Sequence, residues 1–187
     1  MDRAVKIIMV FRVQWFDTRL HGAICADSIV PEFWFRVLPI RRRTSCVGDA
    51  GSSGHGSGSG DGEAVCLVVG FAASDKADRL SAMGAAPAMA AALGQLDEMF
   101  ATEISRIPAT ACFLRGRVQD WGDEPFVRGG YSYPRPGFRA AAPAALAAPV
   151  GGRLFFAGEH TNAHAGMSVH AAYDTGTRAA EEVLAAI

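Results

Sequence analysis

Several features that would assign this chain to a class of protein are absent. No apolar run comes near the ~20 residues that a membrane-spanning helix needs. Lysine and arginine total 18 and aspartate and glutamate 19, a net charge of −1, which gives no electrostatic reason to expect a nucleic acid or an anionic membrane as partner. The first residues enter a strand-like pattern at once and lack the shape of a signal peptide. We therefore expect an intracellular, cytoplasmic protein that binds neither a membrane nor nucleic acid directly.

Cysteine is also scarce and scattered. The four cysteines form no C-x-x-C pair, so the sequence favours reduced, mostly buried thiols over a zinc site or a disulfide framework. His160, His164 and His170 lie near Glu159 in the sequence, but their spacing reproduces neither H-E-x-x-H nor another tight pair of metal ligands. We expect no metal site.

No G-x-G-x-x-G motif follows a strand-like run anywhere in the sequence. The densest glycines alternate with serines within residues 41–62, at the wrong spacing for a nucleotide-binding loop and with no adjoining helix. This segment has too little apolar surface to offset the entropy lost on ordering. We predict that it is a disordered insertion.

What remains is a chain of 187 residues that is 50% hydrophobic, enough to bury the core of one or two small domains. Apolar periodicity predicts both strands and helices, and hence an α/β (α+β) fold. The expected strands are 4–11, 22–28, 33–38, 64–69, 109–121 and 154–157. The first expected helix is capped by Ser74 or Asp75 and runs through Met83. A second opens at Pro87, with Met89, Leu93, Leu96, Phe100 and Ile104 on its apolar face. The last covers about 168–186, with Val169, Tyr173, Gly176, Ala180, Val183 and Ile187 facing a sheet.

The most informative stretch joins the run 154–157 to the last helix. Gly158 ends the run, and Ser168 is placed to cap the helix. A strand, a glycine turn and a helix N-terminus put free N–H groups and a positive dipole end near one point, which suits an anion or a ring that must carry negative charge. An ordinary strand-to-helix connection would give the same pattern, so both interpretations stay open here.

Specific residues favour the first interpretation. The segments Phe156-Ala-Gly-Glu-His-Thr161, Val169-His170 and Gly176-x-Arg178-Ala179-Ala180 resemble the C-terminal flavin-binding signature of the FAD-dependent amine oxidases. These include polyamine oxidases, monoamine oxidases and lysine-specific histone demethylases. Residues 121–133, with the pattern W-x-D-x-P-x-x-x-G-x-Y-S-Y, resemble the segment of that family that crosses the flavin and lines the substrate cavity. Family members are much longer than this chain, so the resemblance is to a C-terminal part.

The resemblance implies roles for individual residues. Trp121 would pack beside the isoalloxazine, and Tyr131 would stand before its reactive face. Gly158 and Glu159 would form the pyrophosphate turn, with the backbone N–H of Glu159 mattering more than its carboxylate. The remaining implied roles are substrate contact by Tyr131, Phe126 and Ser168, stabilisation of negative charge at flavin N1 and O2 by the helix N-terminus at Ser168 and Val169, and a catalytic Lys6 that holds a water beside flavin N5.

The resemblance also implies a function and a domain organisation. Residues 1–120 would form a mixed-sheet substrate-binding domain, and residues 121–187 the C-terminal part of a Rossmann-like FAD-binding domain whose N-terminal dinucleotide-binding half is missing. The implied reaction is hydride transfer from an amine, a polyamine first of all, to flavin N5, followed by imine hydrolysis and release of hydrogen peroxide after reoxidation by oxygen. The alternative is a catalytically inactive truncated fragment, or a binding module without bound FAD.

Overall fold

The computed structural model describes residues 2–39 and 64–187, so the insertion predicted over 41–62 lies outside the described residues. Contacts divide the chain into two compact units. Unit 1 comprises Met1–Val5, Ala73–Asp78 and Asp120–Ile187, and unit 2 comprises Lys6–Ala72 and Arg79–Gln119. The predicted α/β class is confirmed by helices and a five-stranded sheet among the described residues. The functional assignment of residues 1–120 and 121–187 stays a prediction.

The sheet follows the order β2-β3-β4-β1-β5. Its strands are β1 (Ala4–Phe11), β2 (Gly22–Ile24), β3 (Glu32–Pro39), β4 (Ala64–Ala73) and β5 (Phe113–Asp120). Strand β3 pairs antiparallel with both β2 and β4, with Phe35 opposite Val68. Because successive side chains of a strand point to opposite faces, β1 buries Val5, Ile7, Met9 and Phe11 while it exposes Lys6.

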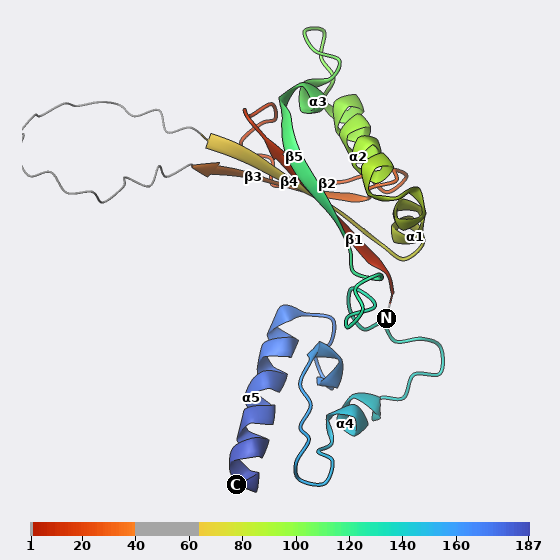
Figure 1. Cartoon of the computed structure of the whole chain (residues 1–187), viewed down its shortest axis with the longest axis vertical. Helices are drawn as coiled ribbons and strands as arrows, with labels where there is room; N and C mark the ends of the chain where they lie inside the picture. Colours follow the sequence, from red (N-terminus) through yellow and green to blue (C-terminus); the bar gives the residue numbers. More distant parts are fainter. Residues whose placement is uncertain (1, 40–63) are drawn as a thin grey trace, which may run out of the picture. The chain divides into compact units, whose positions relative to one another are not determined.

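Three helices accompany the strands: α1 (Ser74–Met83), α2 (Ala85–Phe100) and α3 (Pro108–Cys112). Figure 1 shows α2 and α3 beside the sheet. Gly116 of β5 permits close approach, since a Cβ there would lie 2.6 Å from the carbonyl oxygen of Ile8 and 2.6 Å from Cε of Met89. Aromatic rings fill the core, with centroids 4.9 to 6.5 Å apart among Phe11, Trp15, Phe16, Phe35, Phe100 and Phe113.

Unit 2 departs from the predictions at element ends. The strand expected over 109–121 begins only at Phe113, because residues 108–112 form α3 instead. The buried carboxylate of Asp97 accepts hydrogen bonds from the first N–H groups of that helix, a cap that lies outside the local pattern. Helix α2 ends at Phe100, so Ile104 is 98% exposed and does not extend the apolar face. The strand expected over 22–28 stops at Ile24 and passes into a turn.

Unit 1 contains α4 (Ala142–Ala147), the short 3-10 helix η1 (Glu159–Thr161) and α5 (Val169–Ala186). The strand prediction for 154–157 is wrong. Leu154 makes an isolated bridge to Val150, and the rest of the run joins no ladder in the described part of the chain. A strand needs a neighbouring strand to pair with its backbone N–H and C=O groups. The described residues of unit 1 provide no such strand beside residues 155–157.

The apolar face of α5 also differs from its prediction. Val169 is 88% exposed, Tyr173 75% and Ile187 96%. The buried positions of the helix are Ala171 and Thr175, which lie on another side. The described residues of unit 1 therefore leave the face that was expected to dock onto a sheet open to solvent.

Candidate functional site

Gly158 adopts a backbone conformation that favours glycine, with φ 146° and ψ 153°. A Cβ at this position would lie 2.5 Å from the ring of His160. Two threonines hold the turn. The N–H of Gly158 donates to Oγ1 of Thr175 over 3.0 Å, and its carbonyl oxygen accepts from Oγ1 of Thr161 over 2.8 Å. The turn predicted at Gly158 is thus clamped by η1 and α5.

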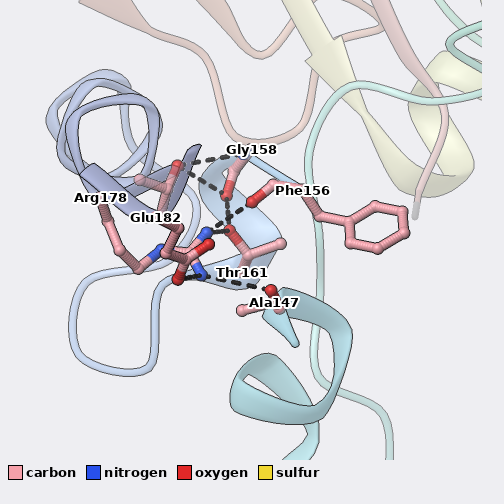
Figure 2. Close-up of polar contacts among 7 residues, drawn as sticks. Ala147, Phe156, Gly158, Thr161, Arg178 and Glu182 are labelled. Carbon is pink, nitrogen blue, oxygen red and sulfur yellow. Dashed lines mark hydrogen bonds and ion pairs between the residues drawn. The ribbon is translucent and has the colours of Figure 1, made fainter. Parts of the chain in front are cut away.

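Arg178 of α5 fixes the segments on either side of this turn (Figure 2). Its Nη2 donates to the carbonyl oxygen of Phe156 over 2.6 Å and lies 3.3 Å from Oγ1 of Thr161. Its Nη1 lies 3.5 Å from the carbonyl oxygen of Ala147 and 3.3 Å from Oε1 of Glu182. The arginine of the G-x-R-A-A motif therefore joins α5 to α4, to η1 and to the extended run before Gly158.

The carboxylate of Glu159 connects three of the predicted cofactor segments. Its Oε1 accepts the N–H of Ser132 over 2.7 Å, and its Oε2 accepts the Ser132 hydroxyl over 2.7 Å and the N–H of Met167 over 2.6 Å. Ser132 follows Tyr131, and Met167 precedes Ser168. Sequence reasoning missed this role of the carboxylate, because no local pattern relates residue 132 to residue 159.

The pKa of Glu159 lies below its ordinary value. Burial acts to raise it, but the hydrogen bonds from Ser132 and Met167 and the charge of His160 together lower it more. The side chain is therefore held ionised by donors that belong to the protein itself.

Ser168 caps α5 as predicted. Its Oγ accepts the N–H of Ala171 over 3.3 Å and donates to the carbonyl oxygen of Ala165 over 2.8 Å. The residue before it, Met167, has φ 65°, a left-handed conformation that is uncommon outside glycine. Val169, the first residue of this 18-residue helix, is exposed, so the positive dipole end of the helix lies close to solvent.

The segment from Trp121 to Tyr131 closes onto the start of the chain. The N–H of Trp121 donates to the carbonyl oxygen of Ala4 over 2.9 Å, and the N–H of Gly130 donates to that of Asp2 over 3.0 Å. Asp2 also forms a bridge with Tyr131, and a Cβ on Gly130 would collide with the Cβ of Ala4. Trp121 and Tyr131 are thus tied to the same short N-terminal stretch.

Two other predicted site residues are exposed. Phe126 is fully exposed at the tip of its loop, so its predicted contact with substrate stays a prediction. Lys6 belongs to unit 2 and is exposed on β1, and its predicted catalytic role also stays a prediction.

Unit 1 contains two notable cavities. The larger, of about 460 Å³, lies beside Arg178, Glu182 and Asp174. The smaller, of about 290 Å³, is lined by Ser132 and Glu159 together with Tyr133, His160, His164 and Met167. We place the candidate site next to the smaller cavity, because it is lined by Glu159, whose carboxylate joins the segments of Tyr131 and Ser168.

Other site types receive no support from the described residues. Within 2–39 and 64–187, no three His, Cys, Asp or Glu side chains are grouped so that they could hold a metal ion. In the same ranges, Cys25, Cys66 and Cys112 are free thiols. None of the helices described for this chain combines the length and apolar character needed to cross a membrane.

Comparison with known proteins gives concordant similarities. A sequence model of the family described as flavin containing amine oxidoreductase matches residues 3–184. A lysine-specific histone demethylase 1 homolog 2 from Arabidopsis thaliana is 41% identical over 64 residues, which cover 34% of this chain and 9% of that protein. Its namesake from Oryza sativa subsp. japonica is 38% identical over 77 residues, covering 41% of this chain and 9% of that protein.

Solved structures resemble almost the whole chain. A double mutant of putrescine oxidase matches with a TM-score of 0.66 and 21% identity, covering 97% of this chain. Cyclohexylamine oxidase from Brevibacterium oxydans IH-35A matches with a TM-score of 0.67 and 20% identity, covering 98% of this chain. In both cases the match spans only 35% of the solved chain. At such identities the likeness shows the fold alone.

Proposed function

The chain belongs to the flavin-containing amine oxidoreductases, and we propose that it supplies part of an enzyme that oxidises an amine with FAD. FAD is the cofactor of this family. The observation that carries the proposal is the convergence at Glu159, whose carboxylate holds the segments of Tyr131, of Gly158 and of Ser168 together. These are the segments for which the motifs predict contact with the flavin.

The residues of unit 1 fit such a cofactor. The N-terminus of α5 at Ser168 and Val169, where Val169 is exposed, would offer the positive dipole end of the helix to an electron-rich ring or a phosphate. The carboxylate of Glu159 is engaged by three internal donors, so the backbone at Glu159 is the part that would face the cofactor. We infer that the backbone at Gly158 and Glu159, the start of α5, and the rings of Trp121 and Tyr131 hold FAD.

When bound, FAD accepts the hydride of the amine and returns the electrons to oxygen. The protein contributes position and charge. Tyr131 and Trp121 would form an aromatic wall that favours an amine carbon near the ring, and Phe126 and Ser168 would contact the substrate. The ammonium group of Lys6 would hold a water and stabilise negative charge that develops on reduced oxygen.

Polyamines are the substrate class that we propose, with hydrolysis of the imine product and release of hydrogen peroxide. The small hydroxyl residue Ser168 supports this, because monoamine oxidases and plant polyamine oxidases have a tyrosine at the corresponding position. A serine there is more similar to the spermine oxidase and histone demethylase branches of the family.

We further propose that activity requires a dinucleotide-binding half that this chain does not supply. Two open surfaces of unit 1 support this: the run 154–157, which lacks strand partners among the described residues, and the exposed apolar face of α5 with Val169, Tyr173 and Ile187. The 35% span of the matched oxidases supports it as well. The alternative function is an inactive fragment, or a binding module without FAD.

A direct test begins with the purified chain. It is incubated with FAD, freed of unbound flavin by gel filtration, and assayed for flavin absorbance and for peroxide after addition of spermine, spermidine or putrescine. The same assays are repeated on a protein extended by the coding sequence upstream of Met1. Retained flavin with peroxide release in either protein supports the proposed enzyme. A colourless, inactive protein in both forms favours the alternative.

A further inference from the structure

The turn that carries Trp121 is closed by the residue before it. Oδ1 of Asp120 accepts the N–H of Gly122 over 2.8 Å, so the carboxylate spans Trp121 and sets the direction of its backbone. The other oxygen, Oδ2, accepts a hydrogen bond from Nη1 of Arg3 over 2.6 Å. Trp121 therefore lies in a turn that is closed by the Asp120 carboxylate, and Arg3 binds that carboxylate.

Arg3 is surrounded by three carboxylates, two from the Trp121 turn and one from α1. Beyond Asp120, its Nη1 lies 2.8 Å from Oδ1 of Asp123, and its Nε lies 3.3 Å from Oδ1 of Asp78 in α1. The Arg3 and Asp120 side chains are 28% and 16% exposed, while Asp123 and Asp78 are each 69% exposed. The contact with Asp120 is therefore the least screened of the three.

Gly122 leaves space for the guanidinium. A Cβ at this position would lie 2.8 Å from Cζ and 2.9 Å from Nε of Arg3. The hydrogen bonds with Asp123 and Asp120 raise the pKa of Arg3, and an arginine side chain stays protonated in proteins in any case. Backbone hydrogen bonds lie on both sides of Arg3. The carbonyl oxygen of Ala4 accepts the N–H of Trp121, and the carbonyl oxygen of Asp2 accepts the N–H of Gly130.

We propose that Arg3 is a positioning residue that fixes the Trp121 turn by neutralising Asp120 and Asp123. Without this cation, the carboxylates of the turn repel each other and that of Asp78, and Asp120 loses the partner that orients it toward Gly122. The role of Trp121 beside the flavin belongs to the function proposed above. The placement of the turn by Arg3 can be tested without any cofactor.

An ion pair that only adds stability would give a different result from a positioning contact. Loss of a merely stabilising pair lowers the free energy of unfolding but leaves the folded Trp121 turn as it was. Loss of a positioning contact changes the turn in molecules that remain folded. The indole N–H of Trp121 and the backbone N–H of Gly122 report on the turn directly.

The experiment uses the ¹⁵N-labelled full chain without flavin. The three tryptophans give three indole signals, and the Trp121→Phe variant identifies the relevant one. Spectra and amide exchange are compared for the wild type, Arg3→Met, Arg3→Lys and a control, Arg139→Met, in which the changed arginine is exposed. We expect Arg3→Met to shift the Trp121 indole signal and to speed exchange of the Gly122 amide about tenfold. Arg3→Lys should have a smaller effect because lysine lacks the planar fork, and Arg139→Met should have none.

A second comparison isolates the repulsion. Adding Asp123→Asn to Arg3→Met should move the Trp121 and Gly122 signals back toward the wild type. Unchanged Trp121 and Gly122 signals in folded Arg3→Met, with only a lower melting temperature, would overturn the proposal. If Arg3→Met does not fold, the same comparison is made with the neutral, polar Arg3→Gln, in which unchanged Trp121 and Gly122 signals would overturn the proposal equally. Failure of the chain to bind FAD would affect none of these readouts.

Discussion

The Glu159 carboxylate accepts both the N–H and the hydroxyl of Ser132, each over 2.7 Å. Because Oε2 also accepts the N–H of Met167 over 2.6 Å, one side chain sets the position of the residue after Tyr131 and that of the residue before the α5 cap. The relation between the aromatic segment and the helix N-terminus therefore depends on a single ionised group.

Replacement of Glu159 by Gln should destabilise the chain by about 1–2 kcal/mol. The amide turns one acceptor oxygen into a donor, which then faces the N–H of Met167 or that of Ser132. The measurement is the urea midpoint. Glu181→Gln on the exposed side of α5 is the matched control and should leave the midpoint unchanged. Equal midpoints for all three proteins would show that the Glu159 contacts contribute nothing.

The stabilisation by Glu159 should depend on pH. The pKa of this carboxyl in the folded chain is lowered from its ordinary value of 4.5. Its contribution is therefore fully present above the pKa of the unfolded chain and is lost as the pH falls through the folded pKa. The melting-temperature difference between wild type and Glu159→Gln should be constant from about pH 7 to 5 and should shrink below about pH 4.5.

The histidines near this carboxylate provide the control for the pH series. His160 contributes a charge interaction with Glu159, and His164 lines the same cavity. If the melting-temperature difference caused by Glu159→Gln still shrinks below about pH 4.5 in a His160→Gln background, its pH dependence comes from Glu159. If the difference no longer shrinks in the His160→Gln background, the pH dependence requires the charge interaction between His160 and Glu159.

Asp97 should be a major stabilising residue of unit 2. It is 6% exposed, and it accepts the N–H groups of Ala109 and Thr110 over 2.8 and 3.0 Å. Asp97→Asn removes the charge and one acceptor, which should cost about 2–3 kcal/mol and should speed amide exchange at Ala109 and Thr110. Glu98→Gln, on the exposed neighbour in α2, should change neither the unfolding free energy nor the exchange rates.

Two glycine-to-alanine changes should have opposite effects. Gly130→Ala would place a methyl group against Ala4 and should destabilise the chain by about 1–3 kcal/mol through overpacking. Gly94 lies within α2 with open space around it, so Gly94→Ala should stabilise by about 0.5–1 kcal/mol. Thermal melts of both variants provide the measurement. Stabilisation by both changes would mean that the loop containing Gly130 can move away from Ala4 at little cost in free energy.

Local patterns predicted a large part of the fold. The β-branched and apolar residues of 4–11 and the three-four spacing after Pro87 each describe a single element, so β1 and α2 appear close to where they were expected. The Ser168 cap was predictable for the same reason, since its partner, the N–H of Ala171, lies within one helical turn.

What the sequence could not predict depends on distant partners. Arg3 and Asp120 are 117 positions apart, and no periodicity relates them. The run 154–157 has the composition of a strand, but composition provides no ladder, and the described chain pairs it only through Leu154. The motif resemblance placed Tyr131, Glu159 and Ser168 in one site, whereas the hydrogen bonds that join them required coordinates.

The compact units are discontinuous in the sequence, and this has a consequence for synthesis on the ribosome. Unit 2 is complete once Gln119 has emerged, but unit 1 combines Met1–Val5 with Asp120–Ile187. Arg3 can therefore meet Asp120 only after all of unit 2 has been made. Unit 2 can fold during translation, as domains generally do when their residues are available. Unit 1 is completed later than unit 2, and termination before Asp120 would leave Arg3 without the carboxylates of Asp120 and Asp123.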